Sequence, residues 1–252
     1  RCYVKSPFTN EDAIYFGGFD PNGFLSTNKA WIFKKIISLG FPSALQMFFE
    51  VTFFTSAIWM SGMLGKNPQA ANQIALNLTS MTYMVALGLG VTAMIRVGNE
   101  KGRQDFISLR RVAISTFFLV FLMSSLFCLF FVVTHDLLPW LYLDGNPPEI
   151  SSDVFTVVEI ASDLILIAAF FQIADGLQAV VLGALRGIQD VIIPAFLIFI
   201  SYGAIGFPVS YYLGLKTEWG ASGIWMGLLT GLTLSALLLL LRFQYLSQKL
   251  DS

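Results

Sequence analysis

Residues 112–133 read VAISTFFLVFLMSSLFCLFFVV and contain no charged side chain. A helix rises about 1.5 Å per residue and the hydrocarbon core of a bilayer is about 30 Å thick, so a run of this length can cross it as a helix. Five further runs are similarly long and apolar: residues 36–60, 70–95, 164–185, 191–215 and 221–241. Hydrophobic residues make up 56% of the chain and charged residues only 12%. We therefore expect an all-α polytopic membrane protein with six transmembrane helices.

Lysine and arginine are distributed unevenly among the segments outside these runs. Thirteen lie in residues 1–35, 96–111, 186–190 and 242–252, and only two lie in the alternate loops. The positive-inside rule therefore predicts that both termini are cytoplasmic. We expect residues 1–35 to form a cytoplasmic linker, 36–242 a transmembrane lobe and 243–252 a cytoplasmic tail. The basic residues flank the spans and are not interleaved with stacking aromatics, so nucleic-acid binding is not expected.

Two carboxylates are the only charged side chains inside the six runs, Glu50 in the first and Asp175 in the fourth. An ionisable group in hydrocarbon is costly and typically marks a substrate or ion pathway. A carboxyl group in such surroundings can exchange a proton for a cation near neutral pH, which is sufficient for antiport. We therefore expect ion-coupled transport, with these acids binding the coupling cation or a cationic substrate. In the alternative interpretation, each acid is protonated and hydrogen-bonded between helices.

Polar side chains accompany the acids. Gln172 stands three residues before Asp175, on the same helix face, and Gln73 and Asn77 are four residues apart in the second run. We expect these stripes to converge with Glu50 on one cavity. The alternative for the glutamines and the asparagine is hydrogen bonding between helices without any contact with a ligand.

Helix breakers form a second pattern. Pro42 lies eight residues before Glu50, and Pro208 lies in the fifth run. Transporters use such residues to free backbone groups around a cavity or to form moving kinks, and we expect a hinge or a structural kink at each proline. Gly88 and Gly90 are interpreted in the same way, as an interruption of the second run.

Other residues indicate packing or anchoring. The spacings Gly183-x-x-x-Gly187 and Gly223-x-x-x-Gly227 are typical of close contacts between helices. Arg186 follows the fourth run at its cytoplasmic end, where a cation near a helix C-terminus is expected to act as an interfacial anchor.

Enzyme and metal signatures are weak. Residues 220–223 read Gly-Ala-Ser-Gly, a pattern found in intramembrane serine proteases. Such a protease needs a histidine base on a later span than Ser222, whereas the only histidine, His135, comes earlier and falls in a loop. One histidine and the distant Cys2 and Cys128 suggest no metal site. We expect no enzymatic activity and no cofactor.

Several strings resemble the C-terminal half of the multidrug and toxin extrusion (MATE) family of cation-coupled antiporters. The likeness covers residues 36–242, and its most specific part is the pattern Gln172-x-x-Asp175-x-x-Gln178 followed by residues 183–190, which read GALRGIQD. The other matching strings are GFPSA at 40–44, FFEV at 48–51, AANQIA at 70–75, IRVGN at 95–99 and GIWMG at 223–227.

The resemblance implies one lobe of a two-lobe transporter with alternating access, in the plasma (inner) membrane. The missing N-terminal six-helix lobe of the same protein would be its partner, and the start at Arg1 likewise leads us to expect a fragment. The family assigns Glu50 and Asp175 to the cation site, implies amphipathic or cationic drugs as substrates, and implies H⁺ or Na⁺ as the coupling ion. Members that use Na⁺ often have tyrosine where this chain has Phe171, so the missing hydroxyl favours H⁺.

Two further alternatives remain open. The same superfamily includes flippases for lipid-linked saccharides, which would favour a basic cavity, whereas the runs hold two acids and no lysine or arginine. The chain could also be a half without transport activity of its own, acting in assembly or regulation.

Overall fold

The computed structural model describes residues 29–142 and 152–251. The chain forms two compact units, residues 1–40 and 41–252. Residues 1–28 of the expected linker lie outside the described residues. In the first unit the described part is the beginning of helix α2 (Lys29–Leu64), so residues 29–35, expected in the linker, are helical.

The second unit is helical in all its described elements. After α2 come α3 (Lys66–Gly102), α4 (Phe106–Thr134), the short 3-10 helix η2 (Leu138–Leu141) and α5 (Ser152–Gly187). The fifth span is built from α6 (Ile192–Phe199), the π-helix η4 (Ile200–Gly206) and α7 (Phe207–Leu215), and α8 (Gly220–Asp251) follows. Six helices in the described ranges are long and apolar enough to cross a membrane, which confirms the predicted all-α, six-span fold.

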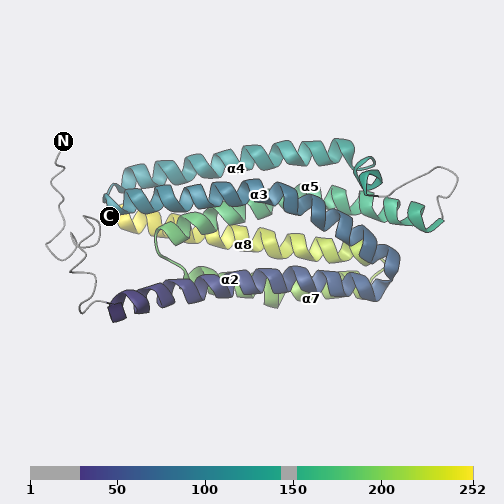
Figure 1. Cartoon of the computed structure of the whole chain (residues 1–252), viewed down its shortest axis with the longest axis horizontal. Helices are drawn as coiled ribbons and strands as arrows, with labels where there is room; N and C mark the ends of the chain where they lie inside the picture. The colour runs from purple at the N-terminus through teal and green to yellow at the C-terminus, as the bar shows by residue number, and fades with distance from the viewer. Residues whose placement is uncertain (1–28, 143–151, 252) are drawn as a thin grey trace. The chain divides into compact units, whose positions relative to one another are not determined.

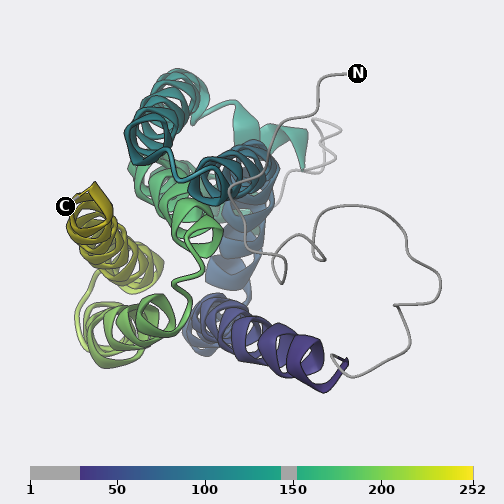
Figure 2. The same cartoon turned by 90° about the vertical axis from the view of Figure 1, so that its left-hand side faces the viewer.

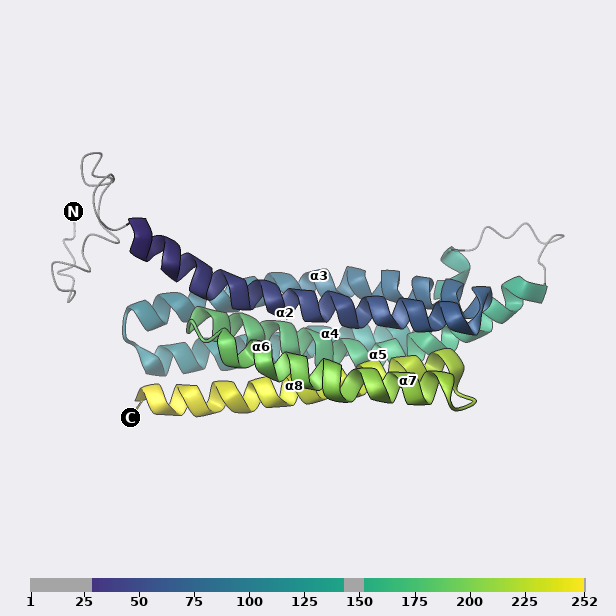
Figure 3. The ribbon, with the colours of Figure 1, turned by 90° about the horizontal axis from the view of Figure 1, so that it is seen from below.

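Helix α5 is the central helix of the second unit. It packs against α3, α4 and α8, and Figure 2 shows it between the α3–α4 pair and α8. The long helices of this unit run side by side in Figure 1. The span made of α6, η4 and α7 packs along α8, as Figure 3 shows from below. Because α5 is surrounded on several sides, residues on most of its faces are buried, polar ones included.

Close helix contacts depend on glycine. Gly183 of α5 faces Gly90 of α3 so closely that a Cβ on Gly183 would overlap the Gly90 backbone. Gly223 of α8 likewise lies against the carbonyl of Leu213 in α7. The packing role of these spacings is confirmed. The interpretation of Gly88 and Gly90 as an interruption was wrong, since α3 is continuous from Lys66 to Gly102.

The two prolines occupy different settings. Pro42 lies inside α2, which continues through it. Pro208 occupies the second position of α7, directly after the π-helix η4. Proline lacks an N–H group and is best tolerated in the first turn of a helix, so the wide turns of η4 separate Pro208 from the regular hydrogen bonding of α6.

Helices α3 and α5 end with the same capping hydrogen-bond pattern at their C-termini. Gln104 and Gln189 follow these helices with φ angles of 58° and 66°, in the left-handed region. The next residue then donates its backbone N–H back into the helix, from Asp105 to Glu100 and from Asp190 to Leu185. Asp105 also begins α4, and the hydrogen bond from the Ser108 backbone N–H lowers its pKa.

Alanine at position 183 should destabilise the protein, because its Cβ would force α5 away from the backbone of α3. We expect Gly183→Ala to lower the free energy of unfolding by about 1–3 kcal/mol, measured as thermal or denaturant unfolding in detergent. Gly88→Ala is the matched control, since nothing lies within 4 Å of a Cβ there. Equal stability of both variants would contradict a close α3–α5 contact.

Candidate functional site

Glu50 and Tyr83 link α2 to α3. The Tyr83 hydroxyl donates a hydrogen bond to Glu50 Oε1 over 3.2 Å. Both side chains are partly exposed. Glu50 therefore lies at the edge of the helix packing, where one of its oxygens is held by protein and the group can still be reached.

Asp175 lies deeper, on α5. It is 6% exposed, and Gln172 one turn earlier is 5% exposed. The Oδ1 atom of Asp175 and both polar atoms of the Gln172 side chain are buried without a hydrogen-bond partner in the described part of the chain. Groups of this kind cost free energy unless they bind something, so α5 carries an unsatisfied polar face in the middle of a membrane span.

The two acids influence each other electrostatically. The carboxyl groups of Glu50 and Asp175 are close enough to repel one another when both are ionised. Arg186 attracts Glu50 from the C-terminal end of α5. A proton or a monovalent cation bound at the pair would relieve the repulsion between the acids, so the arrangement favours the uptake of one positive charge.

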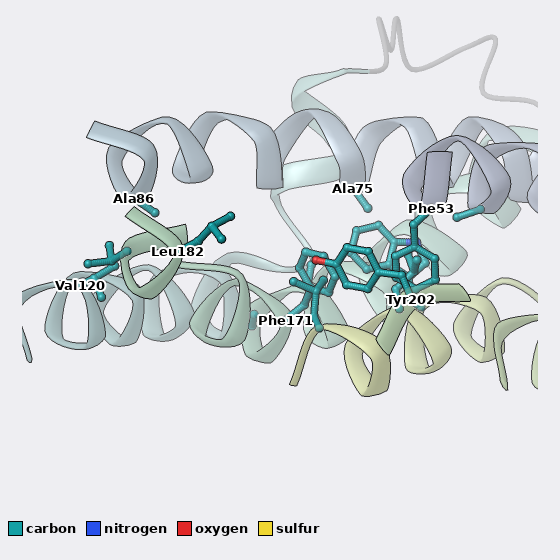
Figure 4. Close-up of a cluster of buried hydrophobic side chains, with 14 of the residues drawn as sticks. Phe53, Ala75, Ala86, Val120, Phe171, Leu182 and Tyr202 are labelled. Carbon is teal, nitrogen blue, oxygen red and sulfur yellow. The ribbon is translucent and has the colours of Figure 1, made fainter. Parts of the chain in front are cut away.

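Gln178 and Tyr202 form a buried pair next to the acids. The Gln178 amide donates to the Tyr202 hydroxyl over 2.6 Å, and the hydroxyl approaches Gln178 Oε1 at 2.8 Å. Tyr202 belongs to the π-helix η4, and its ring stacks on Phe53 of α2 with centroids 4.5 Å apart. Figure 4 shows Phe53, Phe171 and Tyr202 gathered in one group. The π-helix therefore joins the fifth span to both α2 and α5.

The Arg186 side chain points from α5 toward α2. Its Nη2 and Nε atoms donate to Gln46 Oε1 over 3.0 and 3.3 Å. Gln46 is fully buried and donates in turn to the Val191 carbonyl at 2.8 Å. Arg186 thus connects α5 to α2 one turn away from Glu50, a closer involvement than that of an interfacial anchor.

Phe171 is buried in an aromatic cluster. It meets Phe54 edge-on at 5.9 Å and Trp225 at 5.4 Å between ring centroids. The Trp225 indole N–H donates to Asn72 Oδ1 over 2.8 Å. Phe171 therefore packs among other aromatic rings on α5, one turn before Asp175, and offers the acids no hydroxyl.

Two of the predicted site residues lie elsewhere on α3. Gln73 and Asn77 are exposed, whereas their neighbour Asn72 is fully buried. The structure thus brings together Glu50 and Asp175 but leaves the Gln73–Asn77 stripe on the outer side of α3.

Three hydroxyl groups near the acids were not among the predicted site residues: those of Tyr83, Ser124 and Tyr202. Tyr83 stands ten residues after Gln73 in a polar part of the run, a signal that could have been used. Ser124 is one of several hydroxyl residues in its run, and nothing in the sequence sets it apart from the adjacent Ser125. The π-helix displaces Tyr202 from a regular helical pattern, so neither residue had a clear sequence signal.

Residues 42–212 match the sequence profile of the MatE family. The chain therefore belongs to the MATE family. A probable multidrug resistance protein NorM from Agrobacterium fabrum is 35% identical over 215 residues, which are 85% of this chain and 45% of that protein. The multidrug resistance protein MdtK of Proteus mirabilis is 32% identical over the whole chain and 52% of its own length. The chain thus spans about half the length of the curated relatives it matches.

Solved transporter structures share the fold. The crystal structure of the eukaryotic MATE transporter AtDTX14 superposes with a TM-score of 0.77 at 21% identity, over 90% of this chain and 50% of that one. A MOP superfamily transporter from Pyrococcus furiosus gives 0.79 at 17% identity, over 94% and 51%. Six helices of this MATE chain therefore correspond to half of each of these transporters.

Removing the Tyr202 hydroxyl should leave the buried Gln178 amide without its partner. We expect Tyr202→Phe to lower the free energy of unfolding by about 1–3 kcal/mol in detergent. Tyr212→Phe, at a tyrosine that is 63% exposed, should have little effect. If the two variants unfold alike, the Gln178–Tyr202 pair does not stabilise the lobe.

Proposed function

We propose that this chain is one six-helix lobe of a cation-coupled antiporter that exports amphipathic or cationic organic compounds by alternating access. The observation that carries the proposal is the pair formed by Glu50 and Asp175, two carboxyl groups within electrostatic reach of each other inside transmembrane helices. Family membership and the multidrug resistance names of the relatives support the transport class.

The coupling follows from the charge of the acid pair. With both acids ionised, their repulsion favours binding of one cation or one proton. A coupling ion and a cationic substrate then compete for the same negative charge, and each would be released when the other binds. If the two occupied states prefer opposite access, an inward ion gradient drives the substrate outward.

An apolar groove beside α2, the helix that carries Glu50, supports an amphipathic substrate. It lies between α2 and α7, with a volume of about 450 Å³, and Phe48, Trp59, Met63 and Tyr211 contribute to its wall. This volume is in the range of sites for drug-sized molecules, which are commonly lined by aromatic and apolar side chains. Ring faces in the groove would also attract an organic cation.

The complete transporter would need a second lobe. The chain covers 45% and 52% of the NorM and MdtK relatives, and 50% of the AtDTX14 structure. We therefore propose that an N-terminal six-helix lobe of the same protein completes the central cleft, in the plasma (inner) membrane with both termini of this chain cytoplasmic.

Neutralising either acid should abolish transport. In vesicles that contain the complete transporter, Glu50→Gln and Asp175→Asn should each reduce efflux of a fluorescent cationic dye to the background, with unchanged amounts of protein in the membrane. Asp163→Asn is the matched control, because Asp163 is an exposed acid on the same helix as Asp175. Wild-type efflux in both acid variants would remove the basis of the proposal.

The coupling ion is identified by imposing gradients one at a time. Everted vesicles are given either a pH gradient or a Na⁺ gradient, and dye movement is recorded for wild type and Asp175→Asn. We expect one gradient to drive efflux in the wild type and neither to do so in the variant. The absence of efflux under both gradients would argue for a flippase of the same superfamily or for a half without transport activity.

A further inference from the structure

A small cavity lies beside Asp175, on the side of α5 that packs against α3 and α4. Its volume is about 10 Å³, measured as the space open to the centre of a water molecule, and Tyr83, Ser124, Gln172 and Asp175 are among its lining residues. Glu50 is not one of them. Such a volume corresponds to about one water molecule. Tyr83 lines this cavity and also donates a hydrogen bond to Glu50.

The unpaired polar atoms of α5 lie at this cavity. Asp175 Oδ1 and the Nε2 and Oε1 atoms of Gln172 are buried and have no partner among the described residues. The two residues are three positions apart, so they project from one face of α5, and both line the cavity. A single occupant of the cavity can therefore meet both side chains.

Ser124 of α4 completes the cavity. It is 6% exposed, and it lines the cavity together with Gln172 and Asp175. A Cβ on Gly176 would lie 2.6 Å from Ser124 Oγ, so the absence of a side chain at Gly176 lets this hydroxyl approach α5 next to Asp175. Figure 4 shows Ala86 and Val120, the other neighbours of Gly176, on α3 and α4 at this junction.

The cavity contains both hydrogen-bond donors and acceptors, which suits a water molecule better than a metal cation. Gln172 presents both an N–H donor and a carbonyl acceptor, Ser124 can do both, and Asp175 accepts when ionised. Water can accept from the Gln172 N–H while donating to Asp175 Oδ1. A Na⁺ ion could use only the oxygens and would leave the Gln172 N–H unpaired in an apolar setting.

We propose that Ser124, Gln172 and Asp175 hold one buried water molecule, through which Asp175 exchanges protons during coupling. The inference rests on the proposed function and deepens it by naming the residues that position a water molecule beside Asp175. A proton arriving at this water passes to Asp175 Oδ1, the water is regenerated, and release follows the reverse path. Ser124 is a positioning residue, because it acts on Asp175 through the water.

Infrared spectroscopy of the protein in membranes tests the water directly. Difference spectra between low and high pH should contain a C=O stretching band of the protonated Asp175 carboxyl, identified by its loss in Asp175→Asn. Hydrogen bonding lowers the frequency of such a band. We therefore expect a shift to higher frequency in Ser124→Val, which fills the cavity, and a smaller shift in Ser124→Ala, which keeps the fold least disturbed.

Ser125→Ala is the matched control, since the Ser125 hydroxyl donates to the Phe121 carbonyl of its own helix. The band should not move in this variant. An unshifted band in both Ser124 variants would overturn the proposal, and so would the absence of any Asp175 band in the wild type. Displacement of the band by Na⁺ in the wild type but not in Ser124→Ala would make the cavity a cation site and would equally overturn it.

The infrared result is independent of the transport assay. The band reports the surroundings of Asp175 whether or not the chain moves a substrate. Loss of dye efflux in Asp175→Asn together with an unshifted band in the Ser124 variants would leave the proposed function intact and reject the water. A shifted band without any dye efflux would support the bound water and reject the proposed function.

Discussion

The cost of taking two carboxyl groups out of water constrains the rest of this structure. A membrane span supplies no solvent to an acid, so the protein must provide hydrogen bonds, opposite charge or a bound ion. It does so unevenly. Glu50 receives the Tyr83 hydroxyl and the attraction of Arg186, whereas Asp175 Oδ1 has no partner in the described residues. The two acids therefore lie in different surroundings, Glu50 partly exposed and Asp175 buried.

Helix α5 combines packing and chemistry on consecutive segments. Residues 172–178 carry the polar groups, and residues 183–187 hold the glycines that bring α3 against it. Close contact in the second segment fixes the distance between α3 and α5, and this distance sets where Tyr83 stands relative to Asp175. A substitution at Gly183 would therefore change the position of Tyr83 relative to Asp175 without contacting either acid.

Much of the fold and part of the site could be predicted from the sequence. Run lengths define six spans, and a lone acid in each of two spans marks the candidate site regardless of how the helices pack. The side of a helix that faces the core is harder to predict: Asn72 is buried and bonds to Trp225 of α8, whereas the adjacent Gln73 is exposed. The bond between Gln46 and Arg186 joins residues 140 positions apart, and no local pattern predicts it.

The π-helix at Ile200–Gly206 has a consequence for comparisons among relatives. A π-turn accommodates an additional residue compared with an α-turn, so residues after it are rotated about the helix axis relative to those before it. A homologue with a regular α-helix here would need one residue fewer to present the same faces. An ungapped alignment across such a pair could match either Tyr202 or Pro208 to its structural equivalent, but not both.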